Sequence, residues 1–203
     1  MTSKQHWDTV YATKGEHDVS WFEPSPVVSL QLIDATGLAD QTCVLDVGGG
    51  ESRLVDALLA RGVTCIAVLD VAHEALVRAQ ARLGDKARDV DWIQADVIGA
   101  WSWKEVDIWH DRAVFHFLTE RADRDSYKAR LAKMLKPGGF AILATFAPDG
   151  PEKCSGLPVA RYSPETLSSE LGDGFVLVDS RRHTHTTPWG ALQAFQYSRF
   201  IRR

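Results

Sequence analysis

The feature that most constrains the fold is a repeated alternation of apolar, strand-like runs with helix-like runs. Between residues 43 and 146, short aliphatic runs are followed by segments whose apolar residues recur at helical spacing. Strands that alternate with helices of about ten residues build a parallel sheet with helices on both faces. The sequence therefore predicts a doubly wound α/β fold.

The strands and helices can be assigned range by range. The predicted strands are 43–47, 64–69, 90–95, 106–110, 140–146, 175–180 and 191–200, and the predicted helices are 52–61, 73–83 and 123–135. The last of these helices should end at Lys136-Pro137-Gly138-Gly139, and Ser163-Pro164 indicates a further helix start with serine as the cap. No helical run separates the last two strands, so we expect them to form an antiparallel pair.

The first 37 residues precede the first predicted strand. Residues 7–11 and 27–33 have the pattern of short helices, and the segment is either a structural flap or a lid over a ligand site. The remainder, residues 38–203, has the size of one domain.

Composition excludes several classes of protein. The net charge of −4 gives no basic footprint for nucleic acid or for anionic lipid. No apolar run approaches the roughly 18 residues of a membrane span. The first residues, MTSKQHWDTVY, lack the apolar core of a signal peptide, so we expect a cytoplasmic protein without nucleic-acid or membrane partners.

The cysteines favour neither a disulfide framework nor a zinc site, because the chain has three and no Cys-x-x-Cys pair. Cys43 and Cys65 lie in apolar runs and are expected to be reduced core residues. His183 and His185 alternate along one strand, but no ligand spacing joins them with Cys154 into a metal site, and no metal is expected.

A glycine-rich turn, Asp46-Val47-Gly48-Gly49-Gly50, follows the first strand and opens the first helix. Glycines let a ligand approach the backbone, and the helix N-terminus offers free N–H groups, so this turn is the expected ligand site. Arg53 occupies the third glycine position of the dinucleotide fingerprint, which argues against NAD or FAD, and the phosphate-binding Walker pattern is absent. The alternative is a tight strand–helix corner without a ligand.

Two acidic residues stand at the ends of the next two strands. Asp70 can accept hydrogen bonds from ribose hydroxyls, and Asp96 can bond an adenine amino group. Each can instead be a helix or turn cap. The glycine-rich turn, Asp70 and Asp96 stand at three successive strand ends, so together they favour one adenosine ligand.

These residues resemble the class I S-adenosylmethionine-dependent methyltransferases. The likeness is carried by VLDVGGGESRLVDALLARG, by VLD at 68–70, by ADV at 95–97 and by LKPGGFAILATF. It implies a Rossmann-like, seven-stranded sheet that is mostly parallel with an antiparallel last strand. It also implies that Gly48 and Gly50 approach the methionine part of the cofactor, that Asp70 binds the ribose and that Asp96 with Val97 flanks the adenine. We expect the full set of cofactor-binding residues to include the neighbouring Asp46, Gly49 and Val71, the N-terminal Trp7 and Tyr11, and His110 at the end of the fourth strand.

The N-terminal run HWDTVYATKGEHDVSWFEP is similar to two subgroups, the thiopurine and tellurite-resistance methyltransferases and the small lysine methyltransferases. In both, a W-x-x-x-Y pair and a later tryptophan cover the cofactor, which implies a lid of Trp7, Tyr11 and Trp21. The run WHDRAVFHFL is similar to a stretch of both subgroups, with Ala113 where they have glycine.

The candidate catalytic residues follow the fourth strand, next to the expected donor. Asp111 can orient or deprotonate an acceptor, and Arg112 can bind an anionic acceptor. His116 can act as a general base, because the ordinary pKa of histidine lies near neutrality. The alternatives are a structural Asp111–Arg112 ion pair and a core His116. The candidate acceptor-binding residues are Trp21, Phe146, Cys154 and Arg161.

The sequence therefore predicts an S-adenosylmethionine-dependent methyltransferase that acts on a small molecule. The acidic balance and the absence of an added recognition domain favour that acceptor over a macromolecule. The alternatives are a protein lysine methyltransferase, a nucleotide-binding oxidoreductase and a non-catalytic adenosyl-binding module.

Overall fold

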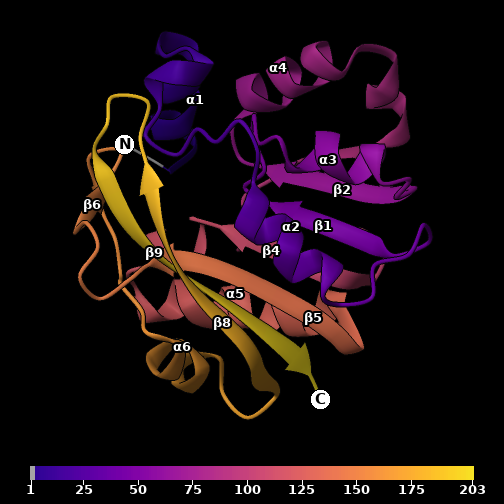
Figure 1. Cartoon of the computed structure of the whole chain (residues 1–203), viewed down its shortest axis with the longest axis vertical. Helices are drawn as coiled ribbons and strands as arrows, with labels where there is room; N and C mark the ends of the chain where they lie inside the picture. The colour runs from indigo at the N-terminus through magenta and orange to yellow at the C-terminus, as the bar shows by residue number, and fades with distance from the viewer. Residues whose placement is uncertain (1–2) are drawn as a thin grey trace.

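The computed structural model describes residues 3–203, so the first two residues of the predicted 1–37 lid segment lie outside the described part. Seven strands form one sheet (Figure 1). Across the sheet they are β3 (Asp91–Gln94), β2 (Cys65–Asp70), β1 (Cys43–Val47), β4 (Val106–Arg112), β5 (Leu135–Phe146), β9 (Leu192–Arg202) and β8 (Phe175–Thr186). The β9 strand is antiparallel to both neighbours, and β3, β2, β1, β4 and β5 pair in parallel. The predicted doubly wound, seven-stranded fold is confirmed.

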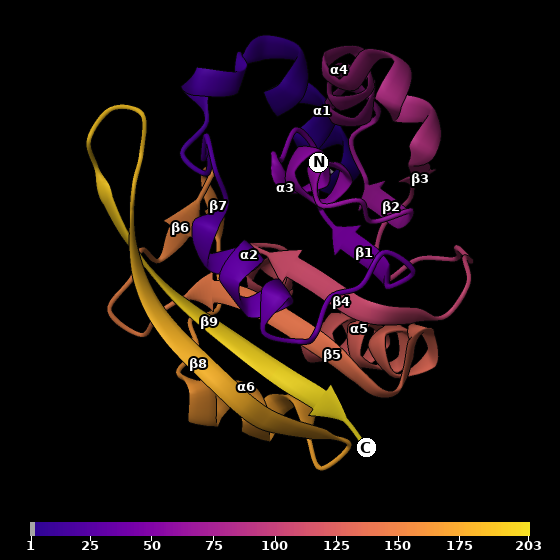
Figure 2. The same cartoon turned by 45° about the vertical axis from the view of Figure 1, so that its right-hand side comes forward.

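Helices cover both faces of the sheet (Figures 1 and 2). The helices are α1 (Ser3–Thr13), α2 (Val27–Asp34), α3 (Leu54–Ala60), α4 (His73–Leu83), α5 (Arg121–Met134) and α6 (Pro164–Leu171), with 3-10 turns η1 (Glu16–Asp18), η2 (Gly84–Asp89) and η3 (Phe115–Phe117). Residues of α2, α3 and α4 pack with alternate strand residues such as Val44, and α5 and α6 pack with the intervening ones such as Leu45. The two-residue period of each strand therefore divides the apolar side chains between two cores.

The expected element limits differ from the observed ones mainly at the start of β5 and at the last hairpin. The α5 helix ends at Met134, and β5 begins at Leu135 and includes Lys136-Pro137-Gly138-Gly139, which was predicted as a turn, because Leu135 already pairs with Val106 before an irregularity in the ladder. The predicted strands 175–180 and 191–200 are observed as β8 and β9, which pair from Phe175↔Arg202 to Thr186↔Leu192. The extended hairpin reaches past the rest of the sheet (Figures 1 and 2). A small second sheet joins β6 (Lys153–Cys154) to β7 (Leu157–Pro158). The Ser163 cap of α6 is confirmed, since its side chain accepts a hydrogen bond from the Thr166 N–H.

The expectation that Cys43 and Cys65 are reduced core residues is wrong. They form a disulfide between the first residues of β1 and β2, which are also register partners in the parallel ladder. Each residue is only partly buried. Spacing along the sequence does not reveal which residues of two neighbouring strands stand side by side, so the pair was missed. The third cysteine, Cys154, is free and buried.

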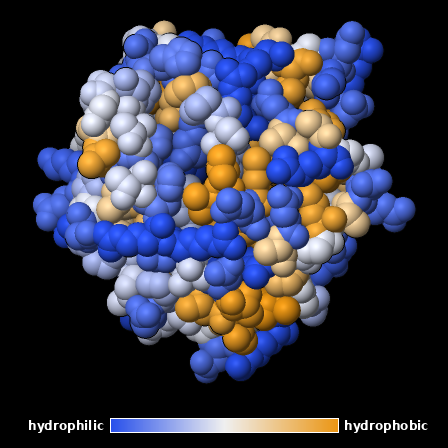
Figure 3. All heavy atoms as spheres, in the orientation of Figure 1, coloured by the Kyte–Doolittle hydropathy of each residue, from blue (hydrophilic) through white to orange (hydrophobic). Residues whose placement is uncertain are grey.

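The surface facing the viewer in Figure 3 is mostly polar, with apolar patches between the charged side chains. Large apolar side chains with substantial exposure include Trp189 and Leu192 at the hairpin end. No helix among residues 3–203 is long and apolar enough to span a bilayer.

Candidate active site

A cavity of about 210 Å³ lies at the edge of the sheet where β1, β2, β3 and β4 end. The parallel strands and the intervening turns bring side chains from distant parts of the sequence to this edge. The lining includes Trp7, Tyr11, Trp21, Gly48, Asp70, Val71, Asp96, Val97, Arg112, Phe117, Cys154, Gln193 and Phe195. Eight of the predicted cofactor-binding and lid residues are therefore on its wall.

The glycine-rich turn is shaped so closely that side chains do not fit at its glycines. A Cβ at Gly48, where φ is +64°, would lie 2.1 Å from a methyl group of Val114. At Gly50, where φ is +44°, it would lie 2.8 Å from the Tyr11 hydroxyl and 3.0 Å from a carboxylate oxygen of Asp70. The turn therefore presents bare backbone to α1 and the cavity.

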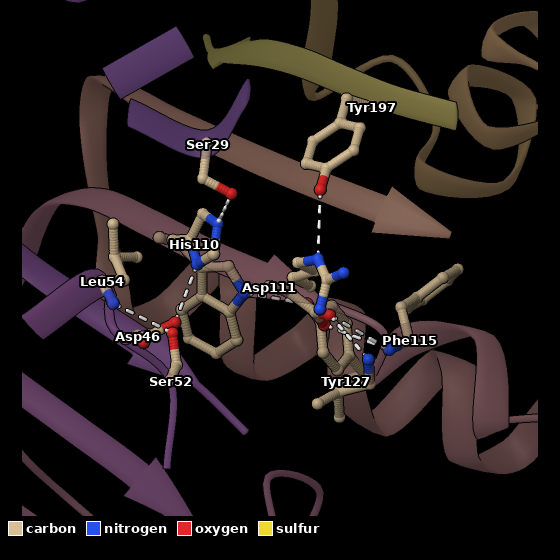
Figure 4. A network of polar contacts seen from close by, with 12 residues as sticks. Ser29, Asp46, Ser52, Leu54, His110, Asp111, Phe115, Tyr127 and Tyr197 are labelled. Atoms are coloured by element: carbon tan, nitrogen blue, oxygen red, sulfur yellow. Dashed lines mark hydrogen bonds and ion pairs between the residues drawn. The ribbon is translucent and has the colours of Figure 1, made fainter. Parts of the chain in front are cut away.

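A second cavity of about 60 Å³ adjoins the turn and is more polar. Its wall includes Asp46 and His110, which form a buried pair with 2.7 Å between Oδ1 and Nδ1 (Figure 4). The other ring nitrogen of His110 lies 2.9 Å from the Ser29 hydroxyl, so the imidazole is held from both sides. The second carboxylate oxygen of Asp46 has no hydrogen-bond partner in the described chain. This small cavity therefore contains a buried acceptor oxygen beside the glycines.

The two acidic residues at the strand ends are placed as predicted, on the wall of the larger cavity. Burial raises the pKa of Asp70 to about 7, although the Ala72 N–H bonds its carboxylate at 2.8 Å. Asp96 accepts a hydrogen bond from the Ile98 N–H at 3.2 Å. Each carboxylate thus caps a local turn, as the alternative interpretation expected, and its binding of a ligand stays a prediction.

The N-terminal segment covers the cavity with contacting aromatic rings. The Trp7 ring lies 5.6 Å from that of Trp21 and 5.2 Å from that of Phe117, and Tyr11 lies 6.2 Å from Trp21. On its outer side, Arg78 of α4 donates hydrogen bonds to the backbone carbonyls of Lys14 and Tyr11.

Hydrogen bonds and ion pairs also hold residues 20–23 of this segment against β4 and β8. Arg112 donates to the Trp21 carbonyl at 2.9 Å and pairs with Glu23 at 3.0 Å. His185 of β8 lies 3.4 Å from the Glu23 carboxylate and 2.7 Å from the Ser20 carbonyl. Burial alone would raise the pKa of Glu23, but the hydrogen bond from His185 and the charge of Arg112 outweigh it and lower the pKa.

Asp111 is not part of the cavity wall. Its carboxylate accepts the Tyr127 hydroxyl at 2.6 Å and the N–H groups of Val114 and Phe115 at 2.9 and 3.1 Å (Figure 4). Burial raises its pKa to about 6, with these hydrogen bonds acting in the opposite direction. The expected alternative of an Asp111–Arg112 ion pair is replaced by this network, since Arg112 pairs with Glu23.

Of the other predicted residues, one lines the cavity and three do not. Cys154 lines the cavity, and burial raises the pKa of its thiol to about 11. His116 and Phe146 are fully buried outside the wall, with ring centroids 4.8 Å apart. Burial lowers the pKa of His116 to about 3. Arg161 also lies off the wall, where it bonds the Gly150 carbonyl and Glu152.

Several wall residues were not predicted from the sequence. Gln193 and Phe195 lie on β9, and Glu23 follows the lid tryptophan. The sequence around Gln193 and Phe195 gives no sign of the cavity, because these two residues reach it only when β9 enters the sheet beside β5. Ala113 adopts φ of +71°, the left-handed region that favours glycine, which accounts for the glycine of the similar subgroups at this position.

Among residues 3–203 no group of three or more His, Cys, Asp or Glu side chains is arranged to hold a metal ion.

Residues 44–139 match the family model described as a methyltransferase domain. This part of the chain is a methyltransferase domain. The expected family is thereby supported, and the matched segment contains the glycine-rich turn and both acidic strand ends. No curated protein matches the chain significantly.

Solved structures share the fold at low identity. The chain is similar to the N-methyltransferase NodS from Bradyrhizobium japonicum WM9 in complex with S-adenosyl-L-homocysteine, at 16% identity and a TM-score of 0.72, over 97% of this chain and 98% of that one. It is also similar to the 1,6-didemethyltoxoflavin-N1-methyltransferase of Burkholderia thailandensis, at 20% identity and a TM-score of 0.68, over 95% and 80%. A putative methyltransferase in complex with the Trm112 activator of Haloferax volcanii matches at 15% identity and a TM-score of 0.73, over 99% and 97%.

Proposed function

We propose that this protein transfers a methyl group from S-adenosylmethionine to a small-molecule acceptor. The observation that carries the proposal is the glycine turn, which has no room for side chains and adjoins the unpartnered buried oxygen of Asp46. A buried carboxylate oxygen without a donor is costly, and the amino group of a bound amino-acid moiety would satisfy it.

The donor would extend across both cavities. Asp46 with Gly48, Gly49 and Gly50 would hold its methionine part in the smaller cavity, beside His110. Asp70 with Val71 would bind the ribose, and Asp96 with Val97 would flank the adenine in the larger cavity. When bound, S-adenosylmethionine supplies an activated methyl group. Structures of similar fold crystallised with S-adenosylhomocysteine support the choice of ligand.

The chain's own contribution would be positioning and exclusion of water. Residues 1–37 are proposed as a lid over the domain of residues 38–203, with Trp7, Tyr11 and Trp21 above the donor. Orientation of an acceptor against the methyl group can supply most of the acceleration that a displacement needs. Arg112 is the predicted catalytic residue whose side chain reaches the wall, whereas Asp111 and His116 would act on the site through packing.

A cavity of about 210 Å³ favours a small acceptor over a folded protein. The cytoplasmic location predicted from the sequence stays a prediction. The disulfide between Cys43 and Cys65 argues for an oxidising compartment, so the location needs its own measurement.

Thermal unfolding with S-adenosylhomocysteine, and with NAD in parallel, tests the donor. A ligand at 100 times its Kd adds about 2.7 kcal/mol, which for this chain length raises Tm by roughly 5–10 °C. We expect that rise with S-adenosylhomocysteine alone. A rise with NAD alone would favour the oxidoreductase, and no rise with either would contradict the proposal. Methyl-labelled donor in lysate then separates the acceptor classes, since label in the small-molecule fraction supports the proposal and label confined to protein supports the lysine methyltransferase.

A further inference from the structure

The end of the larger cavity away from Asp70 and Asp96 has its own chemistry. We call it the distal end and define it by the lining residues Trp21, Arg112, Phe117, Cys154, Gln193 and Phe195. On the proposed function, the donor occupies the other end and the smaller cavity. The distal end is then the space left for the acceptor.

Gln193 stands out on this wall. It is 9% exposed, and its side-chain oxygen Oε1 is buried with no hydrogen-bond partner in the described chain. Its position follows from the topology, because β9 runs antiparallel to β5 and begins at the edge where the parallel strands end (Figure 1). A buried acceptor without a donor is unfavourable, so a ligand that donates a hydrogen bond to Oε1 gains affinity.

Aromatic rings form much of the wall around Gln193 at the distal end. Phe195 lies two residues along the same strand and lines the same wall. On the side of the N-terminal segment, the Trp7 ring contacts the rings of Trp21 and Phe117 edge to face. Aromatic walls of this kind bind planar ligands well.

The charges at the distal end are already paired. The Arg112 guanidinium contacts Glu23 at 3.0 Å and lies 4.9 Å from the centre of the Phe195 ring. The Cys154 thiol is neutral at pH 7, since burial raises its pKa to about 11. A charged acceptor would therefore lose its hydration without gaining a free counter-charge from these residues.

We propose that Gln193 is the specificity-determining residue of the acceptor site, and that the acceptor is an uncharged planar molecule that donates an N–H or O–H group to Gln193 Oε1. The inference rests on the proposed function, because it assumes that the donor fills the other end. The distal end would therefore discriminate between acceptors that differ in a single hydrogen-bond donor or in a single charge.

The test uses the full chain saturated with S-adenosylhomocysteine at pH 7.5, with the Tm rise recorded first. The probes are two matched pairs, benzimidazole with 1-methylbenzimidazole and indole with 1-methylindole, together with benzoate and benzamidine as charged comparators. Kd values are measured by NMR titration. The variant is Gln193→Leu, and the control is Gln41→Leu, an exposed glutamine before β1 at the opposite edge of the sheet.

We expect each N–H probe to bind about fivefold tighter than its N-methyl partner, the strength of one hydrogen bond. In Gln193→Leu that ratio should fall to about one while the affinity for S-adenosylhomocysteine stays within twofold, and Gln41→Leu should keep the ratio. Equal binding within the pairs in the unaltered chain overturns the inference, as does tighter binding of benzoate or benzamidine than of benzimidazole. Absence of the initial Tm rise instead overturns the proposed function.

Discussion

One carboxylate oxygen of Asp46 lies 2.7 Å from His110, and the other faces the position that a Cβ of Gly49 would occupy, only 2.6 Å away. His110 thus fixes one oxygen of the Asp46 carboxylate, and the absence of a side chain at Gly49 leaves space beside the other oxygen. Val68 closes the remaining space, with a methyl group 2.8 Å from the same Cβ position.

Gly49→Ala should therefore damage both packing and ligand binding. Overpacking of this kind costs about 1–3 kcal/mol, and the added methyl group would displace the Asp46 carboxylate. We expect at least a tenfold weaker affinity for S-adenosylhomocysteine by calorimetry. Gly174→Ala is the matched control, because a Cβ there meets no atom within 4 Å and the free energy of unfolding should change by less than about 0.5 kcal/mol. Unchanged affinity in Gly49→Ala would contradict the proposed role of the turn.

Asp70→Asn should strengthen the unliganded fold and weaken donor binding. Burial raises the pKa of Asp70 from 3.8 to about 7 in the folded protein, so its contribution to stability is complete below pH 3.8 and is lost as the pH rises through 7. An asparagine side chain does not ionise, so Asp70→Asn avoids that loss of stability. At pH 8 we expect the variant to be more stable than the original chain by an amount on the order of 4 kcal/mol. Denaturant unfolding at pH 4 and pH 8 measures the difference, with exposed Asp173→Asn as the control.

The same variant should bind S-adenosylhomocysteine about 10–100-fold more weakly at pH 8, because hydrogen bonds to an ionised carboxylate are stronger than those to an amide. In the original chain the affinity should fall as the pH drops below 7, where Asp70 takes up a proton. Affinity that is independent of pH and of the substitution would show that Asp70 does not hold the ribose.

The sequence predicted the fold because period and length are local properties. The helix His73–Leu83 and the strand Cys43–Val47 have their predicted limits, since an amphipathic stripe and a short aliphatic run have single interpretations. The cavity residues at strand ends, such as Asp70 and Asp96, followed from the rule that parallel strands end at one edge.

What depended on non-local register could not be predicted. Cys43 and Cys65 pair because β1 and β2 align their first residues, and Gln193 reaches the cavity because β9 inserts between β5 and β8. Asp111 lies at the expected strand end, but its oxygens turn toward Tyr127 and the backbone of the following turn. Position in the sequence placed these residues on the right element without giving the direction of their side chains.

Glu23→Gln should loosen the N-terminal segment. In the folded protein the pKa of Glu23 is lowered from 4.5, so its ionised form contributes stability above that value and the contribution is lost as the pH falls through the lowered pKa. At pH 7 we expect a cost of about 2 kcal/mol, because the charge of Arg112 is left without its partner. The difference from the original chain should shrink as the pH falls through that lowered pKa.

Stopped-flow release of S-adenosylhomocysteine should also be faster in Glu23→Gln, since the lid loses its inner fastening. Glu152→Gln breaks an exposed ion pair with Arg161 and serves as the control, with expected changes below about 0.5 kcal/mol. Equal release rates in the two variants would mean that the segment does not gate the cavity.

The disulfide gives the last prediction, which also bears on where the protein functions. Unfolded without reductant, the oxidised chain should expose one titratable thiol, that of Cys154, and three after reduction. The bridge closes a sequence separation of 22 residues, for which the chain-entropy model gives about 3 kcal/mol. Reduction should therefore lower Tm by roughly 6–12 °C, and a Cys43→Ser, Cys65→Ser double variant should lose that response while Cys154→Ser keeps it.

Because the bridge lies at the start of β1 and β2, opposite the cavity, reduction should change the affinity for S-adenosylhomocysteine by less than twofold. Three thiols in protein isolated without reductant would contradict the bridge and restore the cytoplasmic location as the simpler expectation.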